Sequence, residues 1–400
     1  TDFAAILLSN KIYFYGGWNS SILNDFFYID LSQSFDASNP PFQFNFTLTQ
    51  KGGYSAITYE DEMIIFGGYN TVGNINDLVI IKEVPSNFTR TITSTNSSNP
   101  NSWPSQRKWP TAVIDSTKAK MYVWGGSETV NPNNAINDGA IYILDVLSYS
   151  WSINIVPTQP IGRQRNTATL IPDGNIIMIG GYFNPDIAQL DIYNTITGQW
   201  SQKIATIIGT ISARWGHTAT LATNNQSIIM FGGISNSSET IDGIAVLNLT
   251  DYVWTSVTPS GNSPSETPNS HTATLYNDYI FFAFGIIGTS TFINTVSILD
   301  ISNSQYKWVY LYSPRASNPN PSITNTTSTA GTSNISNNLN IGIIVGSVFG
   351  SVVEIRAGNV HVSANEVVDN RMNVNRIANN ESANNEVVFD NLWSSSADRK

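Results

Sequence analysis

Short apolar runs alternate with polar breaks from the start of the chain to about residue 313. The runs are rich in Ile, Val, Tyr and Phe, and Gly, Asn and Pro separate them. No stretch of the first 310 residues sustains the apolar period of about 3.6 residues that an amphipathic helix needs. The pattern therefore predicts strands throughout this part of the chain and excludes a helical solenoid.

The clearest repeating unit lies between Arg214 and Trp254. It holds an apolar strand at 217–221, a second at 228–231 that ends in paired glycines, a third at 244–249 and a fourth that closes on the Trp. Variants of this unit recur six times, with glycine marks roughly 51 to 58 residues apart, a period typical of radial sheet repeats. In the sixth repeat, Ile286 stands where a second glycine is expected. The repeat glycines are Gly16, Gly17, Gly67, Gly68, Gly125, Gly126, Gly180, Gly181, Gly232, Gly233 and Gly285.

The second strand of every repeat is apolar on both faces, as expected for a sheet packed between two neighbouring sheets. The paired glycines after it can adopt positive φ and leave no side chain where backbones crowd together. We therefore expect replacement of Gly232 by Val to impair folding.

In combination, the paired glycines, the downstream Tyr or Asp and the Trp cover about residues 1–313 and resemble the kelch-repeat β-propellers, including the related central domain of galactose oxidase. The resemblance implies an all-β fold, a six-bladed kelch-type β-propeller with four-stranded blades. Its His/Asn-Thr-Ala strand would be innermost and its Trp strand outermost, with Trp103 as the mark of the second repeat. We expect blades at about 1–50, 51–106, 107–160, 161–210, 211–265 and 266–313.

How the ring closes stays open at this point. Both ends of the repeat region fall at repeat edges, so closure uses packing alone or a strand that this sequence lacks, and a missing seventh blade is an alternative. Thr1 begins directly in a strand-like run, so we expect a fragment or a processed chain. The ring itself is expected to be monomeric.

The composition changes after Trp308. Residues 314–338 are rich in Ser, Thr, Asn and Pro and are predicted to be a disordered linker. Residues 339–353 form a short apolar segment with a glycine at every fourth position, predicted to be a helix and a possible truncated transmembrane helix, since such glycines let membrane helices approach closely. Its uncharged core, 341–353, is shorter than the roughly 20 residues of a span, so membrane association stays one of two alternatives. The order of propeller, stalk and apolar helix resembles fungal-type membrane-anchored kelch proteins, and the Asn-rich residues 354–400 are predicted to be a disordered tail.

Charge and cysteine usage exclude several classes of function. The 400 residues carry a formal net charge of −10 and no basic cluster interleaved with aromatics, so nucleic acid is not an expected partner. The chain has no cysteine, which excludes disulfides, zinc–thiolate sites and thiol catalysis.

One mouth of the propeller channel is the expected place for a ligand. Alignment of the repeats on Ala4, Ala56, Ala112, Ala168, Ala219 and Ala273 brings a ring of side chains to this mouth: Asp2, Tyr54, Pro110, Asn166, His217 and His271. Three positions before this ring, three of the repeats have an arginine: Arg107, Arg163 and Arg214. Arg165 lies close to this partial basic set in the sequence. These arginines either capture a carboxylate or sulfate by bidentate hydrogen bonds, or begin strands and pair with acids of neighbouring blades.

His217 and His271 occupy equivalent positions in adjacent repeats. Either they face one metal or substrate, or they are hydrogen-bonding repeat residues ahead of Thr-Ala-Thr. The copper-radical cofactor that galactose oxidase resemblance would imply needs a cysteine, which is missing here. No nucleophile elbow, zinc-protease or phosphate-binding motif is present in the sequence, so we assign no catalytic residue, no metal ligand and no cofactor.

The sequence thus favours a non-catalytic module that binds an unknown protein or carbohydrate, with a mutarotase-like, sugar-modifying enzyme at the channel mouth as the alternative. Its expected contact surface contains an exposed aromatic beside charged forks, as binding hot spots do. Alanine at Arg163, Arg165 and Arg214 is expected to abolish capture of the partner without loss of folding. The residues predicted to bind are Arg107, Arg163, Arg165, Arg214, Trp215, His217, His271, Asn166 and Tyr54.

The expected location is the cell surface or outside the cell, with the cytoplasm as the alternative. Glycosylation sequons support this only in combination with the stalk and the apolar segment. They begin at Asn19, Asn45, Asn87, Asn96, Asn225, Asn236, Asn248, Asn325 and Asn334.

Overall fold

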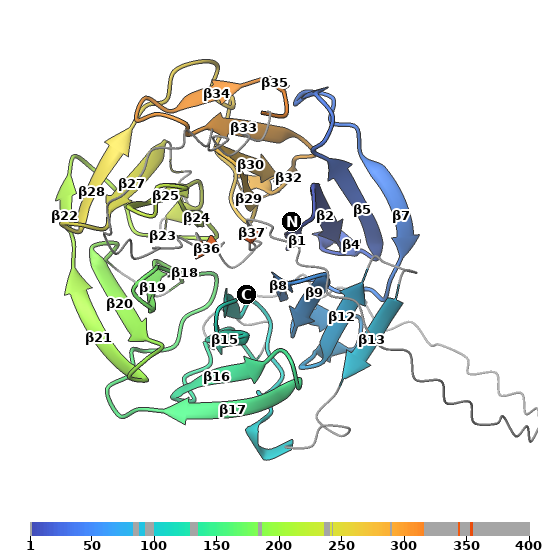
Figure 1. Cartoon of the computed structure of the whole chain (residues 1–400), viewed down its shortest axis with the longest axis vertical. Coiled ribbons are helices and arrows are strands. Elements are labelled where there is room, and N and C mark those ends of the chain that lie inside the picture. The colour runs from blue at the N-terminus through green and yellow to red at the C-terminus, as the bar shows by residue number, and fades with distance from the viewer. Residues whose placement is uncertain are drawn as a thin grey trace, which may run out of the picture. The chain divides into compact units, whose positions relative to one another are not determined.

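The computed structural model describes residues 2–82, 88–92, 100–128, 135–182, 186–235, 241, 243–288, 290–315, 343–344 and 353–354. The chain divides into two compact units, 1–356 and 357–400, and the second lies outside the described residues. The first contains a six-bladed β-propeller with four-stranded blades, as the sequence predicts. The chain passes once around the ring, from the blue strands of blade 1 to the orange strands of blade 6 (Figure 1).

The strands of each blade follow in chain order from the innermost to the outermost. Blade 1 consists of β1 (Ala4–Leu8), β2 (Lys11–Tyr15), β5 (Asp25–Asp30) and β7 (Gln43–Thr47). Blade 2 consists of β8 (Ser55–Tyr59), β9 (Glu62–Phe66), β12 (Leu78–Lys82) and β13 (Phe88–Ile92). Blade 3 consists of β14 (Thr111–Asp115), β15 (Lys120–Trp124), β16 (Ala140–Asp145) and β17 (Ser150–Ile155).

Blade 4 consists of β18 (Thr167–Leu170), β19 (Asn175–Ile179), β20 (Gln189–Asn194) and β21 (Gln199–Ile204). Blade 5 consists of β24 (Thr218–Leu221), β25 (Ser227–Phe231), β27 (Ile244–Asn248) and β28 (Val253–Val257), with β22 (Thr206–Ile208) added at its outer edge. Blade 6 consists of β29 (Thr272–Tyr276), β30 (Tyr279–Ala283), β33 (Val296–Asp300) and β34 (Lys307–Val309). The six innermost strands contact one another around the ring, and β29 returns to β1.

The core lies between the blades. The second strands β9, β25 and β30 are buried along their whole length, because each is covered by a blade on either side. Their apolar side chains form clusters that bridge adjacent blades, such as the one that joins blades 2 and 3. This arrangement explains why the second strands have no polar face in the sequence.

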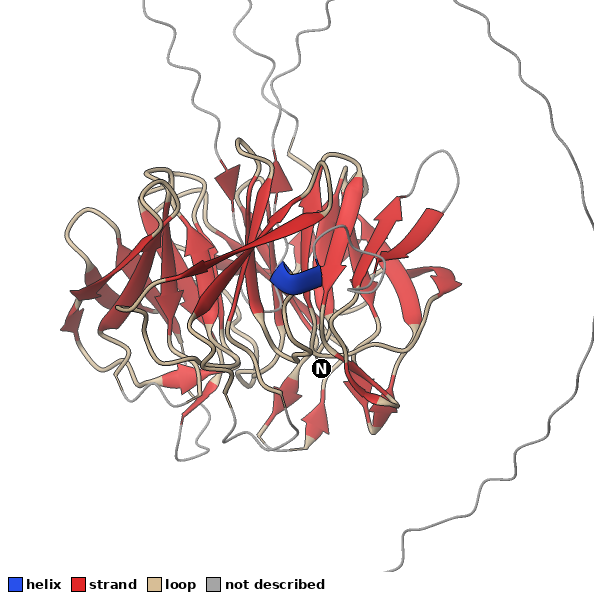
Figure 2. Ribbon diagram, turned by 90° about the horizontal axis from the view of Figure 1, so that it is seen from below, coloured by secondary structure: helices blue, strands red, loops and turns tan. Residues whose placement is uncertain are grey.

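Short strand pairs project from one face of the ring, where the chain leaves the paired glycines (Figure 2). We call this the glycine face. Its short strand pairs are β3 (Trp18–Asn19) with β4 (Ser21–Ile22), β10 (Tyr69–Asn70) with β11 (Gly73–Asn74), β23 (Arg214–Trp215) with β26 (Ile234–Ser235), and β31 (Ile286–Ile287) with β32 (Thr291–Phe292).

The sixth repeat corrects the assignment of its glycine. Ala283 pairs with Thr272 as Phe231 pairs with Thr218, so Phe284 occupies the first glycine position and Gly285 the second. Phe284 has φ +60° and its ring stacks on Phe3 with centroids 5.0 Å apart. Packing against blade 1 supports a backbone conformation that a bulky residue rarely adopts.

Trp103 does not mark the outermost strand of blade 2, which is β13. It follows the 3₁₀ helix η2 (Pro100–Ser102), and its ring lies 5.9 Å from that of Trp151 in blade 3. The indole N–H donates to the carbonyl of Asn76 at 2.6 Å. The prediction that Trp103 lies in an outermost strand is wrong, because this Trp lies in the connection between blades 2 and 3 and is buried there against blade 3.

The ring closes without exchange of a strand between blades. Each blade is built from one contiguous stretch of sequence, and β35 (Leu311–Tyr312) pairs with β6 (Phe35–Asp36) of blade 1. The fully buried Tyr312 donates its hydroxyl to the carbonyl of Leu31 at 2.9 Å. In the described residues, blade 6 thus meets blade 1 through packing and this short strand pair.

The predicted apolar helix at 339–353 is not observed where the structure describes it. β36 (Ile343–Ile344) and β37 (Val353–Glu354) pair antiparallel instead, and the β-branched Ile343, Ile344 and Val353 favour strands. Among the described residues, no helix has the length and apolar character needed to cross a membrane. The linker after residue 315, the tail after residue 354 and the sequons at Asn87, Asn96, Asn236, Asn325 and Asn334 lie outside the described residues.

Replacing Gly232 with Val should strongly destabilise the propeller. Gly232 has φ +65°, and a Cβ there would collide with the carbonyl oxygen of Pro268 in the next blade. Gly243→Val is the matched control, because Gly243 has φ +87° but no atom within 4 Å of its would-be Cβ. Positive φ costs each variant about 1–2 kcal/mol, so the excess loss at Gly232 measures the contact between blades. Equal losses in thermal unfolding would contradict this contact.

Candidate ligand-binding face

The structure shifts the sequence alignment of blade 1 by one residue. β1 begins at Ala4, as the other innermost strands begin at Ser55 or at a Thr, so Ala5 rather than Ala4 is the repeat alanine. Phe3 therefore shares its position with Tyr54 and His217. The residues just before this position all have φ between 51° and 63°; they are Asp2, Gly53, Trp109, Arg165, Gly216 and Ser270.

The partial basic set of the sequence analysis lies inside the structure. Lys51 belongs to it as well, and all four side chains are buried: Lys51, Arg107, Arg163 and Arg214. Each donates to the carbonyl of the first glycine in its own blade, as Arg107 Nη1 does to Gly125 at 3.1 Å and as the other three do within 3.1–3.3 Å. Their own carbonyls accept the N–H of the second glycine of the preceding blade at 2.8–2.9 Å. One residue thus ties two blades together.

Three of these buried cations are paired with carboxylates. Lys51 contacts Asp77 and Arg163 contacts Asp191. Arg107 Nη2 lies 2.9 Å from Asp138 Oδ2. Burial lowers the pKa of Arg163 to about 10. These side chains have a structural role, as in the second sequence interpretation, but each carboxylate belongs to the same blade as its cation and not to a neighbouring one. The side chains are buried and not exposed to a ligand.

Alanine at Arg163 should therefore unfold the protein more easily instead of sparing its fold. The substitution leaves Asp191 buried without its cation, and breaking a buried pair costs about 3–5 kcal/mol. Arg165→Ala is the matched control, because Arg165 is only half-buried at the glycine face. Urea denaturation should give a clearly larger loss for Arg163→Ala; comparable losses would contradict the structural role.

The ring residues Tyr54, Asn166, His217 and His271 hold adjacent blades together. Thr167 Oγ1 lies 3.2 Å from His217 Nε2, and Thr218 Oγ1 lies 2.9 Å from His271 Nε2. Thr111 donates to Asn166 Oδ1 at 3.1 Å, and Tyr54 donates its hydroxyl to the carbonyl of Tyr15.

Burial keeps both histidines neutral. It lowers the pKa of His217 well below its ordinary value and the pKa of His271 to about 3. In the part of the chain that the structure describes, no three His, Asp or Glu side chains cluster as metal ligands would. The histidines therefore serve as repeat residues between blades.

Arg165 and Trp215 do reach the glycine face, where they join residues that the sequence analysis missed. The Arg165 guanidinium lies 3.9 Å from the ring centre of Trp109 and 5.3 Å from that of Trp215. The Lys108 ammonium lies 4.0 Å from the same Trp109 ring. We call the following set the mouth cluster: Asp2, Tyr69, Lys108, Trp109, Arg165, Trp215 and Ser270.

Asp2 and Arg165 connect the mouth cluster across the ring. Asp2 Oδ2 accepts from the Tyr69 hydroxyl at 2.9 Å and from the Trp109 indole at 3.1 Å. Arg165 donates to the Ser270 hydroxyl at 2.7 Å and lies 3.7 Å from Asp2 Oδ1. Every blade contributes at least one member. The repeat positions of Arg165 and Trp215 were the signal that could have revealed Lys108 and Trp109, which stand at the same positions in blade 3.

The mouth cluster carries a charge that can change near neutral pH. Burial and, to a smaller extent, the positive charge of Arg165 lower the pKa of Lys108 to about 8, against the opposing effect of the negative charge of Asp2. Above this pH the neutral amine predominates, so the cluster loses one positive charge.

The pKa of Lys108 should respond in opposite directions to two substitutions. Arg165→Gln should raise it by removing a like charge, and Asp2→Asn should lower it by removing an opposite charge. Carbon-13 NMR titration of lysine-labelled protein, with the Lys108 signal assigned from a Lys108→Arg variant, checks both. A Lys108 pKa that neither substitution moves would contradict the arrangement of the mouth cluster.

Comparison with known proteins agrees with this geometry. The family model described as the KLHDC2/KLHL20/DRC7 kelch-repeats domain matches residues 173–346. This part of the propeller is thus similar to kelch repeats. The chain is also similar to the Rho GTPase-activating protein gacHH of Dictyostelium discoideum, with 28% identity over 162 residues, 39% of this chain and 10% of that protein. It thus spans about a tenth of the length of this curated relative. The resemblances to galactose oxidase and to fungal-type membrane-anchored kelch proteins stay predictions.

Proposed function

We propose that this kelch propeller binds another protein through its glycine face, with the mouth cluster at the centre of the contact. The observation that carries the proposal is the convergence of Trp109, Arg165 and Trp215 at the mouth of the ring. Trp and Arg dominate the energetically important centres of protein interfaces. Kelch propellers are typically protein-interaction modules, which supports the same conclusion.

Apolar residues on the surrounding hairpins extend this surface. Val72, at the tip of the β10–β11 hairpin, is 93% exposed. Phe292 of β32 is 39% exposed and its ring lies edge-on to that of Trp18, 5.3 Å away. A partner that covers the mouth cluster would also bury these side chains, so the face combines a polar, aromatic centre with apolar projections.

A carbohydrate ligand has weaker support. Sugars stack on free aromatic faces, whereas the Trp109 ring already faces the Arg165 guanidinium at 3.9 Å and the Lys108 ammonium at 4.0 Å. Nothing among the described residues specifically favours the enzyme alternative. Display at the cell surface stays a prediction that concerns segments outside the described residues.

Trp109→Ala and Trp215→Ala should each weaken partner binding at least tenfold, because they remove the aromatic rings on which the cations lie. Tagged protein is purified from the cells that express it, partners are quantified by mass spectrometry, and direct binding is then measured with the purified partner. Ile155→Ala is the matched control, since Ile155 is 64% exposed on the outermost strand of blade 3.

The proposal fails if both Trp variants retain the partner as well as the wild type does, while circular dichroism shows that they are folded. A glycan array on the same variants tests the carbohydrate alternative. Glycan binding that depends on Trp109, in the absence of a protein partner, would contradict the proposal and favour that alternative.

A further inference from the structure

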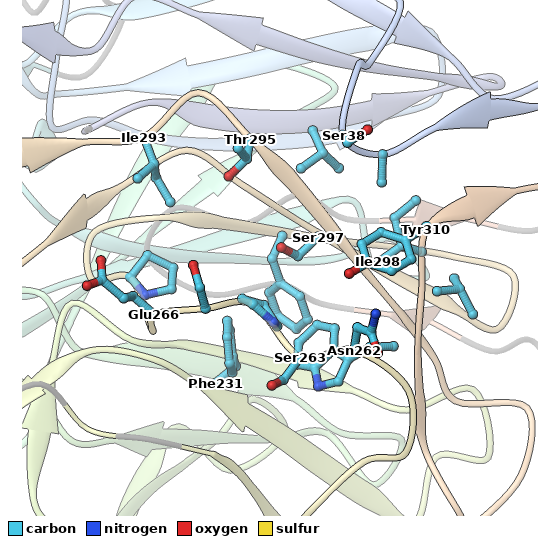
Figure 3. Close-up of a pocket in the computed structure, with 18 of the residues that line it drawn as sticks. Ser38, Phe231, Asn262, Ser263, Glu266, Ile293, Thr295, Ser297, Ile298 and Tyr310 are labelled. Atoms are coloured by element: carbon cyan, nitrogen blue, oxygen red, sulfur yellow. The ribbon is translucent and has the colours of Figure 1, made fainter.

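A cavity of about 370 Å³ lies where blade 5 meets blade 6. Its apolar lining includes Phe231 of blade 5 and Phe282 and Trp308 of blade 6, whose rings lie within 4.6–5.8 Å of one another. In the view of Figure 3, Ser297 stands in the middle of the lining, with Phe231 and Asn262 on one side and Thr295 on the other. Cavities of this size and character are typical of binding pockets.

Other blade junctions fill the corresponding space with an apolar side chain from the connection that enters the blade. Trp103 packs on Trp151 in blade 3. Val156 shares a core cluster with Trp200 in blade 4. In blade 5, Ala205 and Ile211 are buried in the cluster that contains Trp254, and Ile207 packs against it.

Blade 5 shows how such a side chain is delivered. Its entering connection forms β22, which runs parallel to β28, with Thr206 opposite Val253 and Ile207 opposite Trp254. The connection thereby adds a fifth strand to the outer edge of the blade and places Ile207 beside the Trp.

In blade 6, the entering connection pairs in parallel with the outermost strand at one residue only. Ser260 forms a parallel bridge with Lys307, so it corresponds to Thr206, and Gly261 corresponds to Ile207. Gly261 has φ +83°, and a Cβ there would collide with the carbonyl oxygen of Trp308. The chain therefore turns away beside the Trp.

The segment that follows supplies polar atoms and prolines to the cavity. It runs Asn262-Ser263-Pro264-Ser265-Glu266 and is largely exposed. Among the described residues, none between 258 and 272 belongs to the core cluster that contains Trp308. The space that an apolar side chain of the entering connection fills in blade 5 is therefore a cavity in blade 6.

We propose that this cavity binds one large apolar side chain of a partner polypeptide, which approaches where the chain's own connection turns away at Gly261. Ile207 of β22, which lies beside Trp254 in blade 5, indicates this kind of occupant. Two exposed apolar residues continue the surface outwards along the chain, Tyr310 (54%) and Leu311 (65%). Glu266 is the charged residue of the lining, so a basic residue next to the apolar one suits the partner. The site is separate from the mouth cluster.

The test uses a fluorescent peptide that reproduces residues 203–210, the segment around Ile207, and a control peptide with Ile207→Asp. The first peptide should bind the wild-type propeller in fluorescence anisotropy, and the control peptide should bind at least tenfold more weakly. Failure of the first peptide to bind at about 1 mM, near the weak limit of specific affinity, would overturn the proposal.

Ser297→Phe should block the site. Ser297 lies opposite Phe282 on neighbouring strands, so a Phe there projects from the same face into the cavity. Peptide binding should fall at least tenfold, while Ser201→Phe, on the exposed edge strand β21, should leave it unchanged. Because a Phe at 297 could overpack the junction, Ser263→Trp on the exposed segment is the second blocking variant. Undiminished binding to a folded blocking variant would overturn the proposal.

Two further arms separate this site from other interpretations. Trp109→Ala should bind the peptide as the wild type does, since the mouth cluster is not involved; loss of peptide binding there would overturn the placement. Toluene, followed by fluorine NMR of protein that carries fluorotryptophan at position 308, tests small apolar ligands. A Trp308 shift with toluene but none with the peptide would overturn the polypeptide occupant.

Discussion

The contact on which the ring depends is the one between the paired glycines of one blade and the buried basic residue that enters the next. The second glycine donates its N–H to the carbonyl of that residue, and the basic side chain reaches the first glycine carbonyl of its own blade. No side chain fits at this crossing; at Gly180, a Cβ would lie 2.5 Å from the carbonyl oxygen of Arg214. Buried cations are costly unless they are paired and hydrogen-bonded, and the partners of Arg107 and Arg163 meet that condition. Glycine, basic residue and carboxylate therefore form one unit.

Because these contacts fix the spacing of the blades, the residues just before the innermost strands can differ without loss of the ring. They share a left-handed backbone conformation, yet they include an acid, two glycines, a Trp, an Arg and a Ser. Because the residue type at these positions can vary, Asp2, Trp109 and Arg165 contact one another at the mouth of the ring. Non-glycine residues in this conformation cost free energy, and such residues concentrate at functional sites. The glycine face thus combines a rigid support with a variable surface, as binding sites require.

The strand pattern, the number of blades and their inner-to-outer order could be predicted from the sequence, because burial on both faces leaves a direct apolar signature. The role of the arginines could not. Arg163 and Arg165 are two positions apart and chemically identical, but one is buried beside Asp191 and the other lies at the surface between Trp109 and Trp215. Such differences arise from contacts between residues far apart in the sequence, some within a blade and some between blades, and the local spacing of the arginines does not contain them. The same limit explains Trp103, whose partner Trp151 belongs to the next blade, and the misaligned first blade, where Ala4 and Ala5 offered equivalent registers.

Blade 6 departs from the other blades at several linked positions, and one cause accounts for them. Pro268 stands where the junctions into blades 2 to 5 have Lys or Arg. It still accepts the N–H of Gly233 at 3.0 Å, but it has no side chain to bind a first glycine carbonyl, and in this blade Phe284 replaces that glycine. The lost polar link is replaced by aromatic packing of Phe284 with Phe3 and Phe14, whose ring centres both lie 5.0 Å away. This packing joins blade 6 to blade 1, whereas the cavity beside Trp308 lies on the other side of blade 6, at its junction with blade 5, where Pro268 stands in place of a basic residue.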